Sequence, residues 1–302
     1  MADISTAKIK ELRDRTSAGI LDCKKALVAT EGDMEKAVTW LREKGIAKAN
    51  KKAGAVAAEG VTSYVVDGNK AVLFEVNCQT DFVSANEKFK ALVEKIGQVL
   101  IKSNAKNAED ALKEPVGATD LNTMILQESG VLGEKITLRR ISVVEKNADQ
   151  VFGVYKYMGG KISSIVLMNG GSEKVANDIA MHIIAANTEY VSSNDIPQDK
   201  VAQEKEVILK EALNENAQSA KPKPEQIIID KIVPGRLEKA FKEICLLSQM
   251  FIMDANVKIS DYLNNNKATV VSFIKFKVGD GIEKQETDFA AEVAAQAAAF
   301  QK

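Results

Sequence analysis

An apolar hairpin followed by a helix occurs twice in this chain, and this repeated unit constrains its fold more than any other feature. In residues 61–77, apolar and polar residues alternate on either side of Asp67-Gly68, a dipeptide typical of hairpin turns. A helical stripe follows, made of Phe89, Leu92, Val93, Ile96 and Leu100. The pattern predicts an α+β fold.

The second copy of this unit occupies residues 151–169, where two apolar runs flank Gly159-Gly160. A helix carrying Val175, Ile179 and Ile183 follows it. The two copies are about 90 residues apart, a period too long for a solenoid. We therefore expect an internal repeat of a hairpin plus a helix.

The two copies differ in how the second strand reaches its helix. Aligning Val76-Asn77 with Met168-Asn169 brings the second copy to its expected helix cap, Ser172, through two glycines. The first copy has residues 78–83 in between, before Ser84. Because two residues suffice for packing, we expect 78–83 to be a surplus loop, and surplus loops on rigid scaffolds often carry binding groups.

The expected loop contains Asp81-Phe82, an acidic residue followed by an aromatic one. A buried Phe contributes roughly 2–3 kcal/mol, so a Phe in a loop needs an explanation. Two interpretations stay open. Phe82 is a staple that folds back onto the helix, with Asp81 a first-turn acid, or Phe82 is a wedge for a partner and Asp81 a charge directed at it.

The start of the helix after this loop has two candidate caps. Ser84 and Glu87 have the spacing of a capping box, which predicts a helix from about Ala85. Thr80 is a rival N-cap.

The first fifty or so residues predict three short helices, the third capped by Asp33 and closed by Gly45. Residues 47–60 read as a linker.

Residues 192–232 predict a helical hairpin, or short coiled coil, around a Pro-Lys-Pro tip, because proline cannot continue a helix. Residues 268–279 predict a strand, and an alanine-rich amphipathic helix ends the chain.

Charge and composition disfavour several functions. With 41 basic and 42 acidic residues the net charge is −1, which disfavours direct nucleic-acid binding. No apolar run approaches the roughly 20 residues that span a bilayer, and the N-terminus lacks the apolar run of a signal peptide. The odd number of cysteines predicts reduced thiols in a cytoplasm, with Cys78 less certain to be a core residue than the other two, Cys23 and Cys245.

The sequence also argues against an enzyme. The single histidine, His182, lies on an apolar helix and is better explained as a hydrogen-bonded core residue. Neither a nucleophile elbow nor a phosphate-binding loop is present. We therefore expect no catalytic residue, no metal and no cofactor.

The tip of the second hairpin carries Tyr155, Tyr157 and Met158. These residues either form an interface or pack on a neighbour.

Five segments carry a resemblance to a known family. In chain order they are KELRDRTSAGILDCKKAL, EVNCQTDFV, GEKITLRR, AMHIIA and VGDGIEKQETDFAAEVA. Together they resemble bacterial elongation factor Ts over essentially the whole chain. The resemblance implies a ubiquitin-associated-like three-helix domain with the start of a linker (1–54), core subdomain N (55–145), core subdomain C (146–279) with a coiled coil inserted at about 192–232, and a C-terminal helical module (280–302).

The resemblance also implies guanine nucleotide exchange on elongation factor Tu, in its GDP-bound and nucleotide-free states, without covalent chemistry. In that family the segment corresponding to Thr80, Asp81, Phe82 and Val83 enters the partner beside its magnesium site. Phe82 would then separate two partner helices while Asp81 disturbs the network that holds the metal. Thr80 and Val83 would shape the segment.

Further partner contacts follow from the same resemblance. The segment near the N-terminus would dock through Arg13, Ile20 and Leu21, and Leu132-Gly133 would lie near the exchange site. Tyr157 and Met158 would contact a second partner domain, although the family often has a histidine near Tyr157. The C-terminal module would contribute Asp288 and Phe289. The rival functions are an adaptor of the ubiquitin-associated type, or a chaperone-like module, without exchange activity, and a metabolic enzyme.

Overall fold

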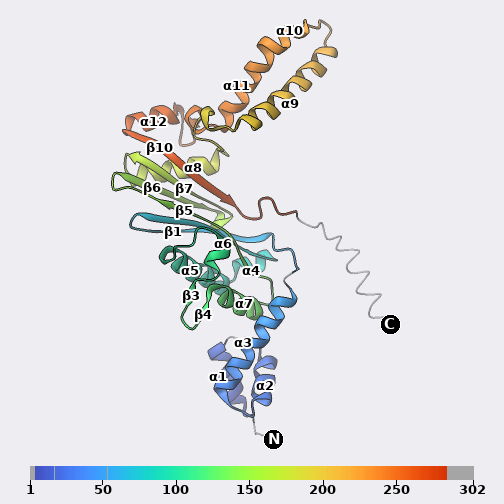
Figure 1. Ribbon diagram of the computed structural model, residues 1–302, viewed down its shortest axis with the longest axis vertical. Helices are drawn as coiled ribbons and strands as arrows, with labels where there is room; N and C mark the ends of the chain where they lie inside the picture. The colour runs from blue at the N-terminus through green and yellow to red at the C-terminus, as the bar shows by residue number, and fades with distance from the viewer. Residues whose placement is uncertain (1–3, 17, 53, 284–302) are drawn as a thin grey trace. The chain divides into compact units, whose positions relative to one another are not determined.

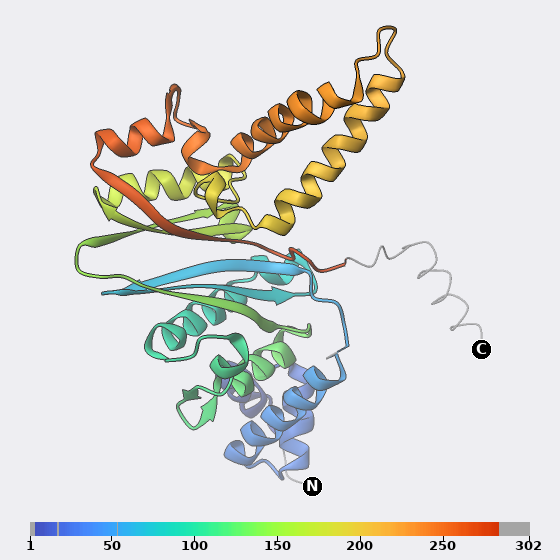
Figure 2. The ribbon, with the colours of Figure 1, turned by 45° about the horizontal axis from the view of Figure 1, so that its top comes forward.

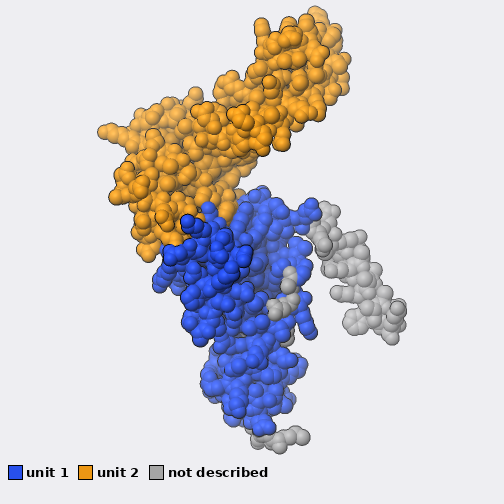
Figure 3. Space-filling view, in the orientation of Figure 1, with its two compact units in different colours: residues 1–63, 74–142, 277–302 blue, residues 64–73, 143–276 orange. Residues whose placement is uncertain are grey.

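The structure is a computed structural model that describes residues 4–16, 18–52 and 54–283 (Figure 1). Its helices and small sheets confirm the expected α+β class. The chain divides into two compact units (Figure 3): unit 1 holds residues 1–63, 74–142 and 277–302, and unit 2 holds residues 64–73 and 143–276. The finer division into four domains stays a prediction.

Unit 1 begins with the three expected helices, α1 (Thr6–Thr16), α2 (Ile20–Ala29) and α3 (Met34–Lys51). Asp33 caps α3 as expected, because its Oδ1 accepts a hydrogen bond from Lys36 N at 3.0 Å. The helices share a small apolar core of fully buried residues: Leu12, Cys23, Ala26, Leu27 and Ala37.

Gly45 does not end the third helix, so the expected helix end at Gly45 and the linker start at residue 47 are both wrong. Helix α3 continues to Lys51 and crosses α7 (Leu121–Leu132). A Cβ atom added to Gly130 of α7 would lie 2.6 Å from Gly45 Cα. Gly45 therefore serves the close approach of two helix backbones, and this contact compensates its low helix propensity.

The first hairpin belongs to a three-stranded sheet with the order β1-β2-β5. Gly68 occupies its turn with a φ of 55°, as the Asp-Gly signal predicts. Helix α5 (Glu87–Lys102) buries the expected stripe and lies with α7 on one side of this sheet (Figure 2). The strands and short elements are β1 (Glu59–Asp67), β2 (Lys70–Cys78), β5 (Thr137–Glu145), α4 (Asp81–Ala85), α6 (Ala108–Ala111), β3 (Pro115–Val116) and β4 (Thr119–Asp120).

Unit 2 is built on the second hairpin, in a sheet with the order β10-β7-β6. β6 and β7 are antiparallel, with Val151 opposite Met168. Ser172 caps α8 as expected, since its Oγ accepts from Val175 N at 3.4 Å. The expected strand at the C-terminal side is β10. The bounds are β6 (Gln150–Tyr157), β7 (Ile162–Gly170), α8 (Glu173–Ala185) and β10 (Ala268–Lys277).

The expected helical hairpin is present in unit 2 (Figure 2). Its first arm is α9 (Gln198–Ala217), and its second arm consists of α10 (Glu225–Ile227), a π-helical turn over Ile228–Ile232, and α11 (Val233–Ile244). Ile208, Ala212, Ile228 and Val233 form the buried seam between the arms. Pro234 explains the π turn, because proline lacks the N–H for a regular helical bond and clashes with the carbonyl four residues back.

The core of unit 2 contains His182, which is fully buried as expected. Its Nδ1 accepts from Ile252 N at 3.2 Å, so Nε2 carries the proton and donates to Gln249 Oε1 at 2.9 Å. Cys23, Cys78 and Cys245 are all buried, and none of them forms a disulfide within the described part of the chain. The remaining short elements are β8 (Met250–Phe251), β9 (Asp254–Lys258) and α12 (Ile259–Asn265).

Candidate partner-binding site

The second half of the expected loop at residues 78–83 is instead the start of a short helix, α4 (Asp81–Ala85). Thr80 is its N-cap, with Oγ1 accepting from Val83 N at 3.4 Å, so the rival cap is confirmed. Ser84 is not a cap and that prediction is wrong, because its Oγ donates to Asp81 O at 2.9 Å. Helix α5 starts later, at Glu87, where Asn86 Oδ1 accepts from Lys88 N at 2.9 Å.

Helix α4 exposes the two residues that the sequence singles out. Phe82 is 85% exposed, so the interpretation of Phe82 as a staple packed on the following helix is wrong. Asp81 is also exposed, and among the described residues no side chain or backbone group pairs with its carboxylate. Thr80 and Val83 are half-buried. An acidic and an aromatic side chain are thus displayed side by side on a capped turn.

Glu134 holds the start of α4 from a distant part of the chain. Its Oε2 accepts from Gln79 N at 3.1 Å and from Thr80 N at 3.0 Å. Its Oε1 accepts from the Thr80 hydroxyl at 2.6 Å. One half-buried carboxylate therefore binds two successive backbone amides and the capping side chain immediately before Asp81.

The carbonyl of Thr80 is also bound within the chain. Cys78, which is fully buried, donates from Sγ to Thr80 O at 3.1 Å, and Ser84 N donates to the same oxygen at 3.3 Å. The N–H, the carbonyl and the hydroxyl of Thr80 therefore all have partners inside unit 1. Thr80 shapes the turn, whereas Asp81 and Phe82 remain available.

The turn that carries Glu134 is itself well connected. Gly133 ends α7 in the left-handed conformation with a φ of 77°. Lys52 donates from Nζ to Gly133 O, Ser129 Oγ donates to Glu134 O, and Lys135 N donates to Gln79 Oε1 at 3.0 Å. The expected contacts Leu132 and Gly133 thus directly precede the residue that anchors α4.

A second buried carboxylate, Glu75 in β2, organises the end of the described chain. Arg140 Nε donates to Glu75 Oε2 at 2.6 Å, and Arg139 Nη1 lies 3.2 Å from Oε1. Gly279 N donates to Oε1 at 2.8 Å, and Arg139 also donates to Asp280 O at 2.6 Å. Segments that are distant in sequence are therefore joined where the chain leads to its last residues.

The other expected contacts lie on separate elements. Ile20 and Leu21 are 55% and 73% exposed on α2, and Arg13 of α1 is exposed. In unit 2, Tyr157 and Met158 are 46% and 69% exposed at the hairpin tip, which excludes a tip packed on its neighbour for these two, while Tyr155 packs against the core. Asp288 and Phe289 lie outside the described residues.

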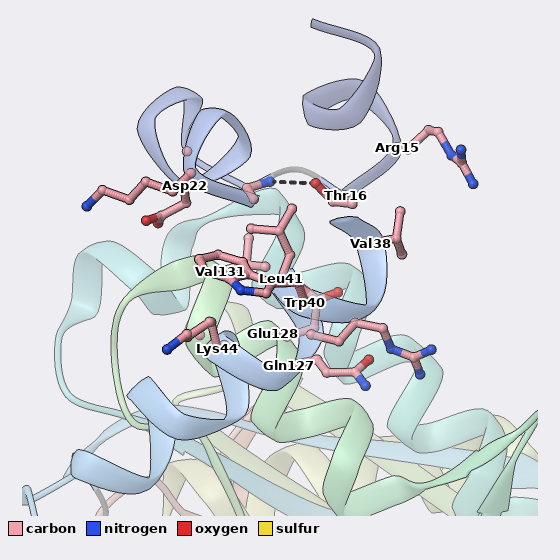
Figure 4. Close-up of a pocket in the computed structure, with 16 residues that line it drawn as sticks. Arg15, Thr16, Asp22, Val38, Trp40, Leu41, Lys44, Gln127, Glu128 and Val131 are labelled. Carbon is pink, nitrogen blue, oxygen red and sulfur yellow. Dashed lines mark hydrogen bonds between the residues drawn. The ribbon is translucent and has the colours of Figure 1, made fainter. Parts of the chain in front are cut away.

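A cavity of about 680 Å³ lies between the α1–α2 connection, α3 and α7 (Figure 4). Trp40, Gly45 and Gly130 are among its lining residues. None of the expected partner contacts lines it, although Gly19 and Val131 of the lining adjoin Ile20 and Leu132. The cavity therefore does not coincide with the exposed surface of α4.

Sequence reasoning missed the residues that support the site. Glu134 and Arg139 both fall in the quoted segment GEKITLRR, but nothing local links them to Thr80 or Glu75.

In the described part of the chain, no helix is long and apolar enough to cross a bilayer. Among the same residues, no three His, Cys, Asp or Glu side chains gather as a metal site would require.

Comparisons with known proteins agree with the resemblance seen in the sequence. A family model described as elongation factor TS matches residues 79–280. The elongation factor Ts of Lactiplantibacillus plantarum is 46% identical over 293 residues, covering 97% of this chain and 98% of that protein. That of Oenococcus oeni is 48% identical over 296 residues, covering 98% and 99%. That of Acholeplasma laidlawii is 47% identical over 295 residues, covering 97% and 98%.

Proposed function

Because the chain belongs to the elongation factor Ts family, we propose that it promotes GDP release from elongation factor Tu by inserting Phe82 of α4 into the partner. Asp81 beside it disturbs the network that holds the partner's magnesium ion. Magnesium bridges the nucleotide phosphates to the protein, so loosening it weakens the hold on GDP. No covalent step is involved.

The observation that carries this proposal is the exposure of Phe82. A phenyl ring that is 85% exposed contributes little to the fold of its own chain. Burying such a ring in a partner yields roughly 2–3 kcal/mol. Each tenfold increase in GDP release requires a barrier lower by about 1.4 kcal/mol, so this one side chain supplies a useful part of the effect.

The remaining expected contacts complete the proposal as docking residues. Arg13, Ile20 and Leu21 would bind from the three-helix part, and Leu132 and Gly133 from the turn beside α4. Tyr157 and Met158 would bind from the second hairpin, and Asp288 and Phe289 from the C-terminal module. Exposed apolar side chains and arginine are the types that interfaces favour, and among the described members of this set Ile20, Leu21 and Met158 are each more than half exposed.

The proposed mechanism requires reciprocity between nucleotide and factor. If the factor weakens the binding of GDP to the partner, GDP must weaken the binding of the factor by the same ratio, and the same reciprocity holds for GTP when the factor weakens its binding. GTP then releases the factor for another cycle. We propose that this cycle takes place in the cytoplasm, where elongation factor Tu is the partner in its GDP-bound and nucleotide-free states.

The direct test is stopped-flow release of a fluorescent GDP from elongation factor Tu, with the wild type and Phe82→Ala. We expect the wild type to accelerate release and Phe82→Ala to lose most of the acceleration while keeping the melting temperature. Met253→Ala, which truncates a side chain 61% exposed in unit 2, is the matched control and should match the wild type. A wild type that binds the partner but leaves GDP release unchanged would instead support the adaptor function.

A further inference from the structure

We propose that Glu134 is a positioning residue for exchange: it fixes the N-terminus of α4, and thereby the direction in which Asp81 and Phe82 are presented. This inference rests on the proposed function, because it assigns a role to Glu134 within the same site. Glu134 does not need to touch the partner in this role. It acts through Thr80.

Glu134 makes several hydrogen bonds at one point of the chain. The carboxylate accepts from Gln79 N, Thr80 N and the Thr80 hydroxyl at 3.1, 3.0 and 2.6 Å. Bonds to an ionised acceptor are shorter and stronger than neutral ones. They fix two successive peptide groups immediately before the residues that are displayed.

Helix α4 is too short to be stable by itself. It spans only Asp81–Ala85, and a helix of this length has no stability of its own in water. Phe82 adds little, because its ring is almost entirely exposed. Besides the buried Ser84, the order of this turn depends on its ends, and Glu134 binds the N-terminal end.

Glu134 lies at a position that is unfavourable for an acidic residue. Glu134 follows Gly133, the residue that ends α7, where the helix dipole disfavours a negative charge. An acidic side chain at such a position needs a compensating interaction. The amides of Gln79 and Thr80 provide it, which points to binding this segment as the task of the carboxylate.

The turn that carries Glu134 is rigid enough to hold the start of α4. Its backbone carbonyl accepts from Ser129 Oγ, and Gly133 N donates to Ser129 O at 2.9 Å. Lys135 N donates to Gln79 Oε1 at 3.0 Å, which adds a second link between the same two segments. The end of α7 and the start of α4 are therefore held together as one piece, ready for binding without reordering.

The test is a double-mutant cycle between Glu134→Ala and Phe82→Ala, measured as the maximal rate of GDP release at saturating factor. A poorly positioned group can cost about tenfold to a hundredfold in rate, so we expect Glu134→Ala to fall in this range. The concentration for half-saturation should change less, because the other docking residues are intact. In the Phe82→Ala background, Glu134→Ala should have a much smaller effect on the maximal rate, because only its effect through Asp81 remains.

Three results separate the possible failures. If Phe82→Ala slows release and Glu134→Ala does not, Glu134 is not a positioning residue although the proposed function stands. If the two losses multiply in the double variant, Glu134 acts independently of Phe82 and the inference is equally overturned. If Phe82→Ala has no effect at all, the proposed function itself is wrong, and the inference is lost with it.

Smaller changes guard against a variant that merely misfolds. Thr80→Val removes the hydroxyl that Glu134 binds and that also caps α4, whereas Thr80→Ser keeps it, so the serine variant should lose less of the maximal rate than the valine variant. Glu94→Ala removes one negative charge from the exposed side of α5 and should behave as the wild type. Amide hydrogen exchange at residues 81–83 should be faster in Glu134→Ala than in Glu94→Ala, and equal rates would contradict the positioning role.

Discussion

Gly130 of α7 lies directly against Gly45 of α3, so close that a Cβ atom on Gly130 would stand 2.6 Å from Gly45 Cα and 2.6 Å from Gly45 O. No real Cβ atom is found at such distances from backbone atoms. The two helices therefore cross with their main chains in contact. This crossing connects the last turns of α3 to the helix that ends beside Glu134.

Gly130→Ala should destabilise unit 1. Forcing a methyl group into a packed contact costs about 1–3 kcal/mol, which outweighs the gain of about 1 kcal/mol in helix propensity. Urea unfolding followed by circular dichroism measures the change. Gly235→Ala in α11 is the control, since nothing lies within 4 Å of an added Cβ there. That variant should gain roughly 0.5–1 kcal/mol, and the same gain in Gly130→Ala would rule out the close crossing.

Glu75→Ala should be among the most destabilising single changes in the chain. Glu75 is fully buried and accepts from Arg139, Arg140, Asn77 and Gly279, so its removal leaves several donors unsatisfied. Removing one partner of a buried ion pair costs about 3–5 kcal/mol, and because both arginines are partly exposed we expect about 3 kcal/mol.

Unfolding in urea tests the Glu75 prediction, with an exposed ion pair as the comparison. Glu238 pairs with Lys242 at 2.7 Å on the surface of α11. Glu238→Gln should leave the unfolding midpoint unchanged, since exposed pairs contribute little. Similar midpoints for the Glu75 and Glu238 variants would contradict the structural role of Glu75.

Protonation of His182 should destabilise the protein in mild acid. Burial lowers the pKa of His182 below its ordinary 6.5, and the hydrogen bond to Gln249 only partly offsets this. Below about pH 6.5 the unfolded chain therefore binds a proton that the folded chain does not. The stabilisation is complete above pH 6.5 and is lost as the pH falls towards the folded pKa, by at most about 1.4 kcal/mol per pH unit.

The free energy of unfolding between pH 7.5 and 5.5 measures this effect. His182→Asn has no group that titrates in this range, so its pH dependence should be shallower than that of the wild type, even if it is less stable throughout. Equal slopes would show that His182 does not account for the loss in acid.

Asn86, rather than Ser84, should be the N-cap residue that stabilises α5. Asn86 Oδ1 accepts from Lys88 N at 2.9 Å, and replacing such a cap by alanine costs about 1 kcal/mol. Asn86→Ser should keep most of the stability, because serine is an equally good cap. Thermal melts of Asn86→Ala and Asn86→Ser should therefore differ by a few degrees, and identical melts would place the cap elsewhere.

Local periodicity was sufficient to predict much of this fold. The stripe from Phe89 to Leu100, the Ser172 cap and the turn at Gly68 all depend on residues a few positions apart, and each is confirmed. The helical hairpin is confirmed for the same reason, since Pro-Lys-Pro can only interrupt a helix. The burial of His182 was also predicted, because this polar residue lies on an otherwise apolar helix.

Predictions from the sequence failed where a segment that is distant in the chain determines the local conformation. Gly45 has the chemistry of a helix end, and only α7 turns it into a crossing point. The segment at 78–83 has the composition of a loop, but its residues 81–83 belong to α4, and Glu134 binds the amides of Gln79 and Thr80 just before that helix. The partner-binding roles of Asp81 and Phe82 stay a prediction, which the exchange assay addresses.

The π-helical turn at Ile228–Ile232 limits how the helical hairpin can move. One extra residue in the turn lets Ile228 and Val233, which are five positions apart, both lie in the seam, whereas a regular helix would direct them to different faces. Two arms with an uninterrupted repeat could slip past each other by a heptad and pack equally well. In this chain such a slip would leave the apolar side chains of the two arms mismatched. The hairpin is therefore restricted to a single register.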